Sequence, residues 1–229
     1  MRMAMLLGAA LFAWGSAAAA QSSNDAPIDN LPARDDASVE RMLSDAERDR
    51  AETRVNDTVS RNALAAWAGC LASRNTTEAG RVLSMDFTTS TYDRAFRMLT
   101  DEDKQCREFR GTLRTQRLLL AGELAEALIE RSDAPVGNLL AKAAAAPATR
   151  AFSFTDRVAL CVVRSVPGDV AKLFATERNS VEEGAAVQAL ATPMGLCARA
   201  AQAKRPLSIN PAGLRAMLAT AAFRSIEDL

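Results

Sequence analysis

The sequence predicts an all-α protein made of two tandem, duplicated units of four or five short helices, each closed by a disulfide. Alanine and leucine dominate the composition and β-branched runs are scarce, a balance that favours helix. The four cysteines form two equally spaced pairs: Cys70 and Cys106 are 36 residues apart, and so are Cys161 and Cys197. The second pair is displaced from the first by 91 residues, which is the fixed-period similarity expected of an internal duplication.

Other positions agree at the same offset, although few of them are identical. Beyond the second cysteine of each pair the offset grows by three residues, so the cysteine positions carry most of the prediction. Representative matches are Leu99 with Leu190, Val82 with Leu173, Asp86 with Glu177, Leu120 with Leu214 and Leu124 with Leu218.

Residues 1–20 are typical of a cleaved signal peptide. Arg2 supplies the positive charge, residues 4–14 are apolar, and Ala18 to Ala20 offer small residues for cleavage after Ala20. An N-terminal membrane anchor is the alternative, but the apolar run is shorter than the ~20 residues that span a bilayer. We therefore expect a periplasmic or secreted protein with no transmembrane anchor after signal removal.

The cysteines of an exported chain meet an oxidising compartment, so we expect disulfides. Four cysteines allow three pairings, and the duplication selects Cys70–Cys106 and Cys161–Cys197. Each bridge would contribute about 4 kcal/mol by restricting the unfolded chain. A zinc site normally uses C-x-x-C pairs or histidines, and a redox-active dithiol uses C-x-x-C. The sequence contains neither a C-x-x-C pair nor a histidine.

Changes in composition along the chain predict its organisation. Proline-containing polar residues without periodicity follow the signal peptide, and a strongly charged helix then runs to about Asn56. Apolar residues recur at three and four positions in two later stretches, which an alanine-rich segment connects. The predicted segments are a signal peptide (1–20), a disordered leader (21–37), helical unit 1 with its preceding charged helix (38–130), a linker (131–152) and helical unit 2 (153–229).

The second unit combines four local features: a helix reading Ala-Leu-Cys-Val-Val-Arg at 159–164, a proline-started turn at Pro167, a capped Ser-x-Glu-Glu helix at 180–183, and Cys197. These features resemble a group of uncharacterised exported alphaproteobacterial proteins with duplicated Cys-bearing helical units. The resemblance covers roughly residues 60–225 and is weaker in the first copy. It implies the helical fold and the export, and it implies no activity.

The chain lacks histidine, which removes the Ser-His-Asp and Cys-His nucleophile systems and the H-E-x-x-H metal site. It also lacks the phosphate-binding G-x-x-x-x-G-K-[ST] loop and the nucleophile motif G-x-S-x-G. We therefore predict no catalytic residue, no cofactor and no metal site, and place an enzyme third among the possible functions. Glu123, Glu126 and Glu130 share one helical side, and we interpret them as a solvated face rather than a hydrolytic carboxylate pair.

Four arginines form a candidate anion-binding stripe, because Arg107, Arg110, Arg114 and Arg117 follow spacings of three, four and three. Guanidinium groups suit phosphate and carboxylate ligands. The alternative, which we favour, is an exposed helical face paired with nearby glutamates.

Cleavage of the signal peptide leaves a nearly neutral chain, which gives no reason to expect nucleic acid as a partner. The sequence best fits a non-enzymatic periplasmic interaction or envelope-maintenance protein whose partner is another envelope protein. The alternative is a carrier of a small apolar or anionic ligand held between the helical units.

Overall fold

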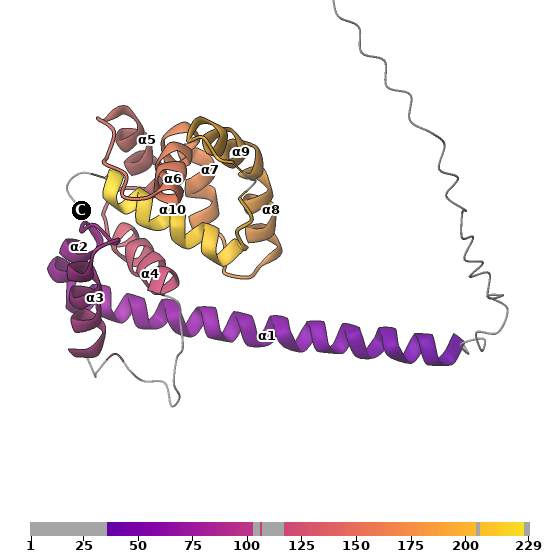
Figure 1. The fold of residues 1–229 in the computed structure, drawn as a ribbon. Coiled ribbons are helices and arrows are strands. Elements are labelled where there is room, and N and C mark those ends of the chain that lie inside the picture. Colours follow the sequence, from indigo (N-terminus) through magenta and orange to yellow (C-terminus); the bar gives the residue numbers. More distant parts are fainter. Residues whose placement is uncertain (1–35, 103–105, 107–116, 205–206, 227–229) are drawn as a thin grey trace, which may run out of the picture. The chain divides into compact units, whose positions relative to one another are not determined.

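The structure is a computed structural model of the chain, and it describes residues 36–102, 106, 117–204 and 207–226. Every regular element in these ranges is a helix, which confirms the predicted all-α class (Figure 1). The helices are α1 (Asp36–Arg74), α2 (Thr76–Leu83), α3 (Ser90–Glu102), α4 (Arg117–Glu130), α5 (Val136–Ala145), α6 (Phe154–Ser165), α7 (Pro167–Phe174), α8 (Val181–Ala189), α9 (Ala191–Ala200) and α10 (Pro211–Ser225).

Helix α1 is continuous, whereas the sequence analysis placed a boundary near residues 56–58. Its 39 residues contain no proline and a single glycine, Gly69, so nothing interrupts the backbone hydrogen bonds. The predicted boundary was the end of the charged helix at about Asn56. Residues of this kind favour caps but are also tolerated inside a long helix at a modest cost.

Both predicted disulfides are present. Cys70 of α1 is bonded to Cys106 with 5.6 Å between their Cα atoms, and Cys161 of α6 is bonded to Cys197 of α9 with a Cα separation of 5.7 Å. Each bond joins residues 36 positions apart, as the pairing within copies requires. Two disulfides are typical of an oxidising, extracytoplasmic environment. Among the described helices, none has the length and apolar character needed to span a lipid bilayer.

Proline and N-capping residues set where helices in the second half of the chain begin. Pro167 begins α7, where its missing N–H is not needed. The Ser180 hydroxyl accepts a hydrogen bond from the Glu183 N–H and caps α8, as the sequence predicted. Asn210 caps α10 in the same way through the N–H of Gly213.

Residues 46–229 form one compact unit that contains predicted unit 2 and all of predicted unit 1 except residues 38–45. Its core centres on α4 and α10, which pack against each other, while α10 also packs against α6 (Figure 1). Helix α5 lies within the predicted linker and packs against α6 and α7, so this stretch contributes to the core through Leu140 and Ala143.

The crossing of α4 and α10 requires a glycine. A Cβ atom added at Gly122 of α4 would lie 2.3 Å from the Cα atom of Ala216 in α10. Such a separation is far below van der Waals contact, so only a residue without a side chain lets the backbones approach this closely. Small residues at one point on each helix therefore fix the centre of the core.

The helix bounds follow the offsets of the predicted duplication. Helices α2 and α7 begin and end 91 residues apart, and α3 and α8 begin at that same offset. Helices α4 and α10 begin at Arg117 and Pro211, an offset larger by the three residues noted above. Gly122 and Ala216, which meet at the helix crossing, are matched by the larger offset. The bounds agree with a tandem duplication, which itself stays a prediction.

Candidate functional site: a cavity and a buried ionic cluster

A buried ionic cluster joins residues of α4 and α10, the two helices at the centre of the core. Its centre is Arg215 of α10, whose side chain is 2% exposed. The Arg215 Nε donates a hydrogen bond to Glu126 at 2.9 Å, and its Nη1 donates to Glu183 at 3.1 Å. Its remaining donors bind the backbone carbonyls of Phe174 and Thr176, both at 3.0 Å. The guanidinium is therefore fully satisfied inside the core.

Two further arginines complete the cluster. Arg61 of α1 forms a bidentate pair with Glu183 at 2.5 and 2.7 Å, and the N–H of Asn179 donates to the same carboxylate at 2.8 Å. Arg178 donates to Glu123 at 2.8 Å. We define the ionic cluster as Arg61, Glu123, Glu126, Arg178, Glu183 and Arg215, in which the positive and negative charges balance.

Electrostatics within the cluster favour the charged forms of its central groups. Burial would lower the pKa of Arg215, but the hydrogen bonds and charges of Glu126 and Glu183 outweigh it and raise that pKa. Burial would likewise raise the pKa of Glu183, but the hydrogen bonds from Arg61 and from the Asn179 N–H lower it overall. At Glu123 burial prevails, and the pKa is raised despite the contact with Arg178.

The expectation of a solvated face at Glu123, Glu126 and Glu130 is therefore wrong for two of the three residues. Glu123 and Glu126 are buried, whereas Glu130 is exposed. The sequence gives a signal that we did not use: both buried glutamates lie within an apolar run of leucine and alanine, and Arg215 interrupts a similar run in α10. A charged residue on an otherwise apolar helix face indicates a buried ion pair.

A cavity of about 410 Å³ is lined by residues of α4, of α10 and of the segments packed around them. Residues from both predicted units line it, so it lies where the carrier alternative expected a ligand. We call it the Tyr92 cavity, after the tyrosine in its wall. The apolar part of its wall consists of Leu83, Phe87, Leu118, Ala121, Ile209 and Met217. A volume of this size, with mainly apolar walls, falls in the range of small-molecule sites.

Polar groups are few in the Tyr92 cavity, and the charged ones are paired. Arg224 and Asp156 form a buried ion pair in its wall, with both side chains 3% exposed. Arg117, the fourth arginine of the predicted stripe, lines the cavity and pairs with Asp93. Tyr92 is 5% exposed, and its hydroxyl has no hydrogen-bond partner in the described part of the chain. Burial raises the pKa of Tyr92 to about 12, so the hydroxyl stays protonated at neutral pH.

Aromatic rings cover the Arg224 guanidinium. Its Cζ atom lies 4.6 Å from the centre of the Phe152 ring and 5.9 Å from that of Phe87. Phe87 also contacts Phe152 and Tyr92 edge to face, with ring centres 5.8 and 6.5 Å apart. Burial lowers the pKa of Arg224 more than Asp156 raises it. The rings therefore form a rigid apolar wall around an ion pair that is already neutral as a whole.

The cavity and the ionic cluster occupy matching positions of the two predicted copies. At the offset of α4 and α10, Ala121 corresponds to Arg215 and Thr220 to Glu126. At the 91-residue offset, Tyr92 corresponds to Glu183, and Phe87 to Arg178. At the position that the predicted duplication matches with Arg215, α4 carries the small side chain of Ala121, which lines the cavity.

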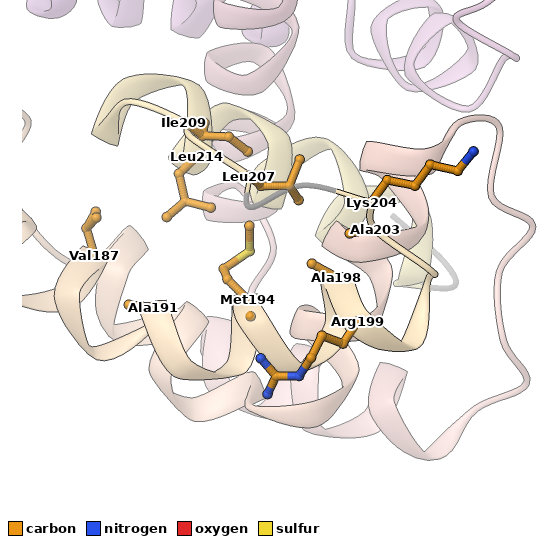
Figure 2. A pocket seen from close by; sticks show the side chains of 11 residues that line it. Val187, Ala191, Met194, Ala198, Arg199, Ala203, Lys204, Leu207, Ile209 and Leu214 are labelled. Carbon is orange, nitrogen blue, oxygen red and sulfur yellow. The ribbon is translucent and has the colours of Figure 1, made fainter. Parts of the chain in front are cut away.

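A second, more open groove of about 580 Å³ lies beside α9. Figure 2 shows Met194 extending from α9 toward Leu207 and Leu214, which form an apolar surface. The charged ends of Arg199 and Lys204 point away from this surface in the same view (Figure 2). We call this feature the α9 groove; its cations do not converge on a common point, unlike those of an anion-binding site.

The arginine stripe can be placed in the structure only in part. Of the arginine stripe, Arg107, Arg110 and Arg114 lie outside the described residues, and Arg117 is paired with Asp93. No group of three or more acidic or cysteine side chains suited to a metal ion is found within the described ranges. Comparison of the chain with protein-family models, with curated proteins and with solved structures finds no match.

Proposed function

We propose that this protein binds a small, mainly apolar molecule in the Tyr92 cavity and acts as its carrier in the periplasm. The observation that carries the proposal is a cavity of about 410 Å³ between segments of the two predicted units. Its walls are apolar and aromatic, and Phe87 and Tyr92 are held in place by edge-to-face contacts. Empty apolar space costs stability, because its lining loses packing contacts, and a bound ligand would restore them.

The location in the periplasm is supported by two independent features. The disulfides Cys70–Cys106 and Cys161–Cys197 indicate an oxidising compartment. The first 20 residues have the composition of a signal peptide. The resemblance to exported alphaproteobacterial proteins points the same way.

The duplication supplies a reason for the cavity. Two copies of one helical plan would place the same kind of site on each side of the α4 and α10 crossing. In this chain one site is closed by the ionic cluster, and its counterpart holds Ala121 and Thr220 instead of Arg215 and Glu126. The proposal is that one site acquired a structural role and the other a binding role.

The expectation of an interaction or envelope-maintenance protein stays open beside this proposal. The α9 groove, with Met194 and Leu207 at its surface, is where we would first look for a contact with another envelope protein. No described contact identifies such a partner. The carrier function has a more specific location, so we place it first.

The proposal is tested by titrating the purified protein with N-phenyl-1-naphthylamine, a neutral dye that fluoresces in apolar surroundings. The wild type should bind it saturably with one site per chain. Ala121→Met should weaken binding by about tenfold or more, because the longer side chain fills the cavity. Ala141, exposed on α5, provides the matched control, and Ala141→Met should bind like the wild type. Absence of saturable binding, or equal binding by both variants, would contradict the proposal.

A further inference from the structure

We infer that the ligand of the Tyr92 cavity is an uncharged apolar molecule with one hydrogen-bonding group, which contacts the Tyr92 hydroxyl. This inference rests on the proposed function and specifies the chemical class of the ligand. It follows from which polar groups of the cavity are already engaged and which one is not.

The charged groups of the wall have partners within the protein. The Nη2 atom of Arg224 donates to Asp156, and its Nη1 atom donates to the carbonyl of Arg150 at 3.2 Å. The other carboxylate oxygen of Asp156 accepts a hydrogen bond from the Phe152 N–H at 2.7 Å. Arg117 is paired with Asp93 at the more exposed edge of the cavity. An ionic ligand would therefore lose its hydration and meet no unpaired opposite charge.

The Tyr92 hydroxyl is the polar group that remains. Tyr92 lines the cavity, and its hydroxyl makes no hydrogen bond to the rest of the described chain. The Tyr92 oxygen is accessible from the cavity, so a ligand that displaces water there must supply a hydrogen bond in its place. The two threonine hydroxyls of this wall have partners: that of Thr220 donates to the carbonyls of Ala216 and Met217 in its own helix, and that of Thr155 is hydrogen-bonded to the Ser153 hydroxyl. Tyr92 is thus the natural contact for a ligand hydroxyl or carbonyl.

Arg224 offers the one competing site. Its Nε atom is buried and has no hydrogen-bond partner among the described residues. An anionic ligand would have to reach this atom, but Phe152 and Phe87 lie against the same guanidinium. The ring contacts favour the neutral ligand, and the experiment below includes the anion as its opposite outcome.

The test uses two probes of equal chain length, 1-decanol and decanoate, which displace N-phenyl-1-naphthylamine from the wild type at pH 7.5. Decanol should displace the dye at a concentration about tenfold lower than decanoate, because the carboxylate loses hydration without gaining a counter-charge. Tyr92→Phe should weaken decanol binding roughly threefold to tenfold, the loss expected for one neutral hydrogen bond. The matched control is Thr76→Val, outside the cavity, which removes a hydroxyl that donates to the Ala72 carbonyl and should leave decanol binding close to that of the wild type.

Each outcome bears on a different statement. Stronger binding of decanoate would overturn the inference in favour of an anionic ligand at Arg224. Equal decanol affinity in Tyr92→Phe and the wild type would overturn the role of the hydroxyl. Both results leave the cavity as a binding site, whereas failure of the dye and of both probes to bind would remove the proposed function itself. Circular dichroism of each variant shows whether the fold is retained.

Discussion

The ionic cluster and the Tyr92 cavity both lie against α4 and α10, at positions that the predicted duplication would match, yet they fill their space differently. On one side Arg215 reaches between Glu126 and Glu183 and binds two backbone carbonyls as well. On the other side Ala121 is too short to reach across, and about 410 Å³ stays open. One helical scaffold can thus be completed from inside by a buried ion network or left to be completed by a ligand.

The strongest test of this comparison substitutes the same residue at both matching positions. Arg215→Met should destabilise the protein by about 3–5 kcal/mol, because it leaves Glu126 without its buried partner and weakens the pairing of Glu183. Ala121→Met should change the free energy of unfolding by less than about 1.5 kcal/mol, because the side chain enters open space. Urea denaturation of both variants measures the difference. Similar losses of stability would show that the two sides are not packed as described.

A second test concerns the crossing that separates the two sides. Gly122→Ala should cost about 1–3 kcal/mol, because the new methyl group overlaps Ala216 and forces α4 and α10 apart. The control is Gly69→Ala in α1, where a Cβ atom would meet nothing within 4 Å. That change should stabilise the helix by about 0.5–1 kcal/mol. Thermal denaturation of Gly122→Ala and Gly69→Ala measures this difference in stability. A Gly122→Ala variant as stable as the wild type would contradict the close approach of α4 and α10 at Ala216.

A third and smaller effect is the pH dependence of the ionic cluster. The folded-state pKa of Glu183 is lowered, so its stabilising contribution is complete above the unfolded value near 4.3 and is lost as pH falls through the folded value. The stability gap between the wild type and Glu183→Gln should therefore narrow as pH is lowered from 6 to 3.

Glu123 provides the control of opposite sign. Burial raises its folded-state pKa, so the protonated side chain favours folding and stability is lost as pH rises through the folded value. Glu123→Gln should gain stability relative to the wild type over that rise. Urea midpoints measured between pH 3 and 7 would show both trends, and parallel curves for the two variants would contradict the assignment.

The sequence was sufficient for features that depend on local pattern or on covalent chemistry. The helical class followed from the alanine- and leucine-rich composition, and the disulfide pairing followed from the spacing of the cysteines. Pro167 and the capping Ser180 predicted the starts of α7 and α8. For the ionic cluster, the sequence shows charged residues that interrupt apolar runs, but not which of them pair, because its members come from five separate segments and meet only through packing. Glutamates spaced along a helix match a solvated face unless the partner arginine is known.

The cavity could not be predicted from the sequence either, because it depends on Ala121 and Thr220 having shorter side chains than Arg215 and Glu126. A small residue in an apolar run gives no sign of whether a neighbouring helix fills the space beside it. The sequence predicts a possible ligand between the two helical units but does not identify the residues that would bind it. Ala121 and Thr220 can be compared with Arg215 and Glu126 only in the folded structure, where all four residues lie on α4 and α10.

The most direct measurement of the central claim is non-denaturing mass spectrometry of the full chain purified from a bacterial periplasm. We predict that the wild type carries an additional mass of lipid-like or aromatic size, that heating or organic solvent releases it, and that Ala121→Met is isolated without it. The same bound mass on both proteins, or a bare wild type that also fails to take up N-phenyl-1-naphthylamine, would contradict the claim that the Tyr92 cavity holds a ligand.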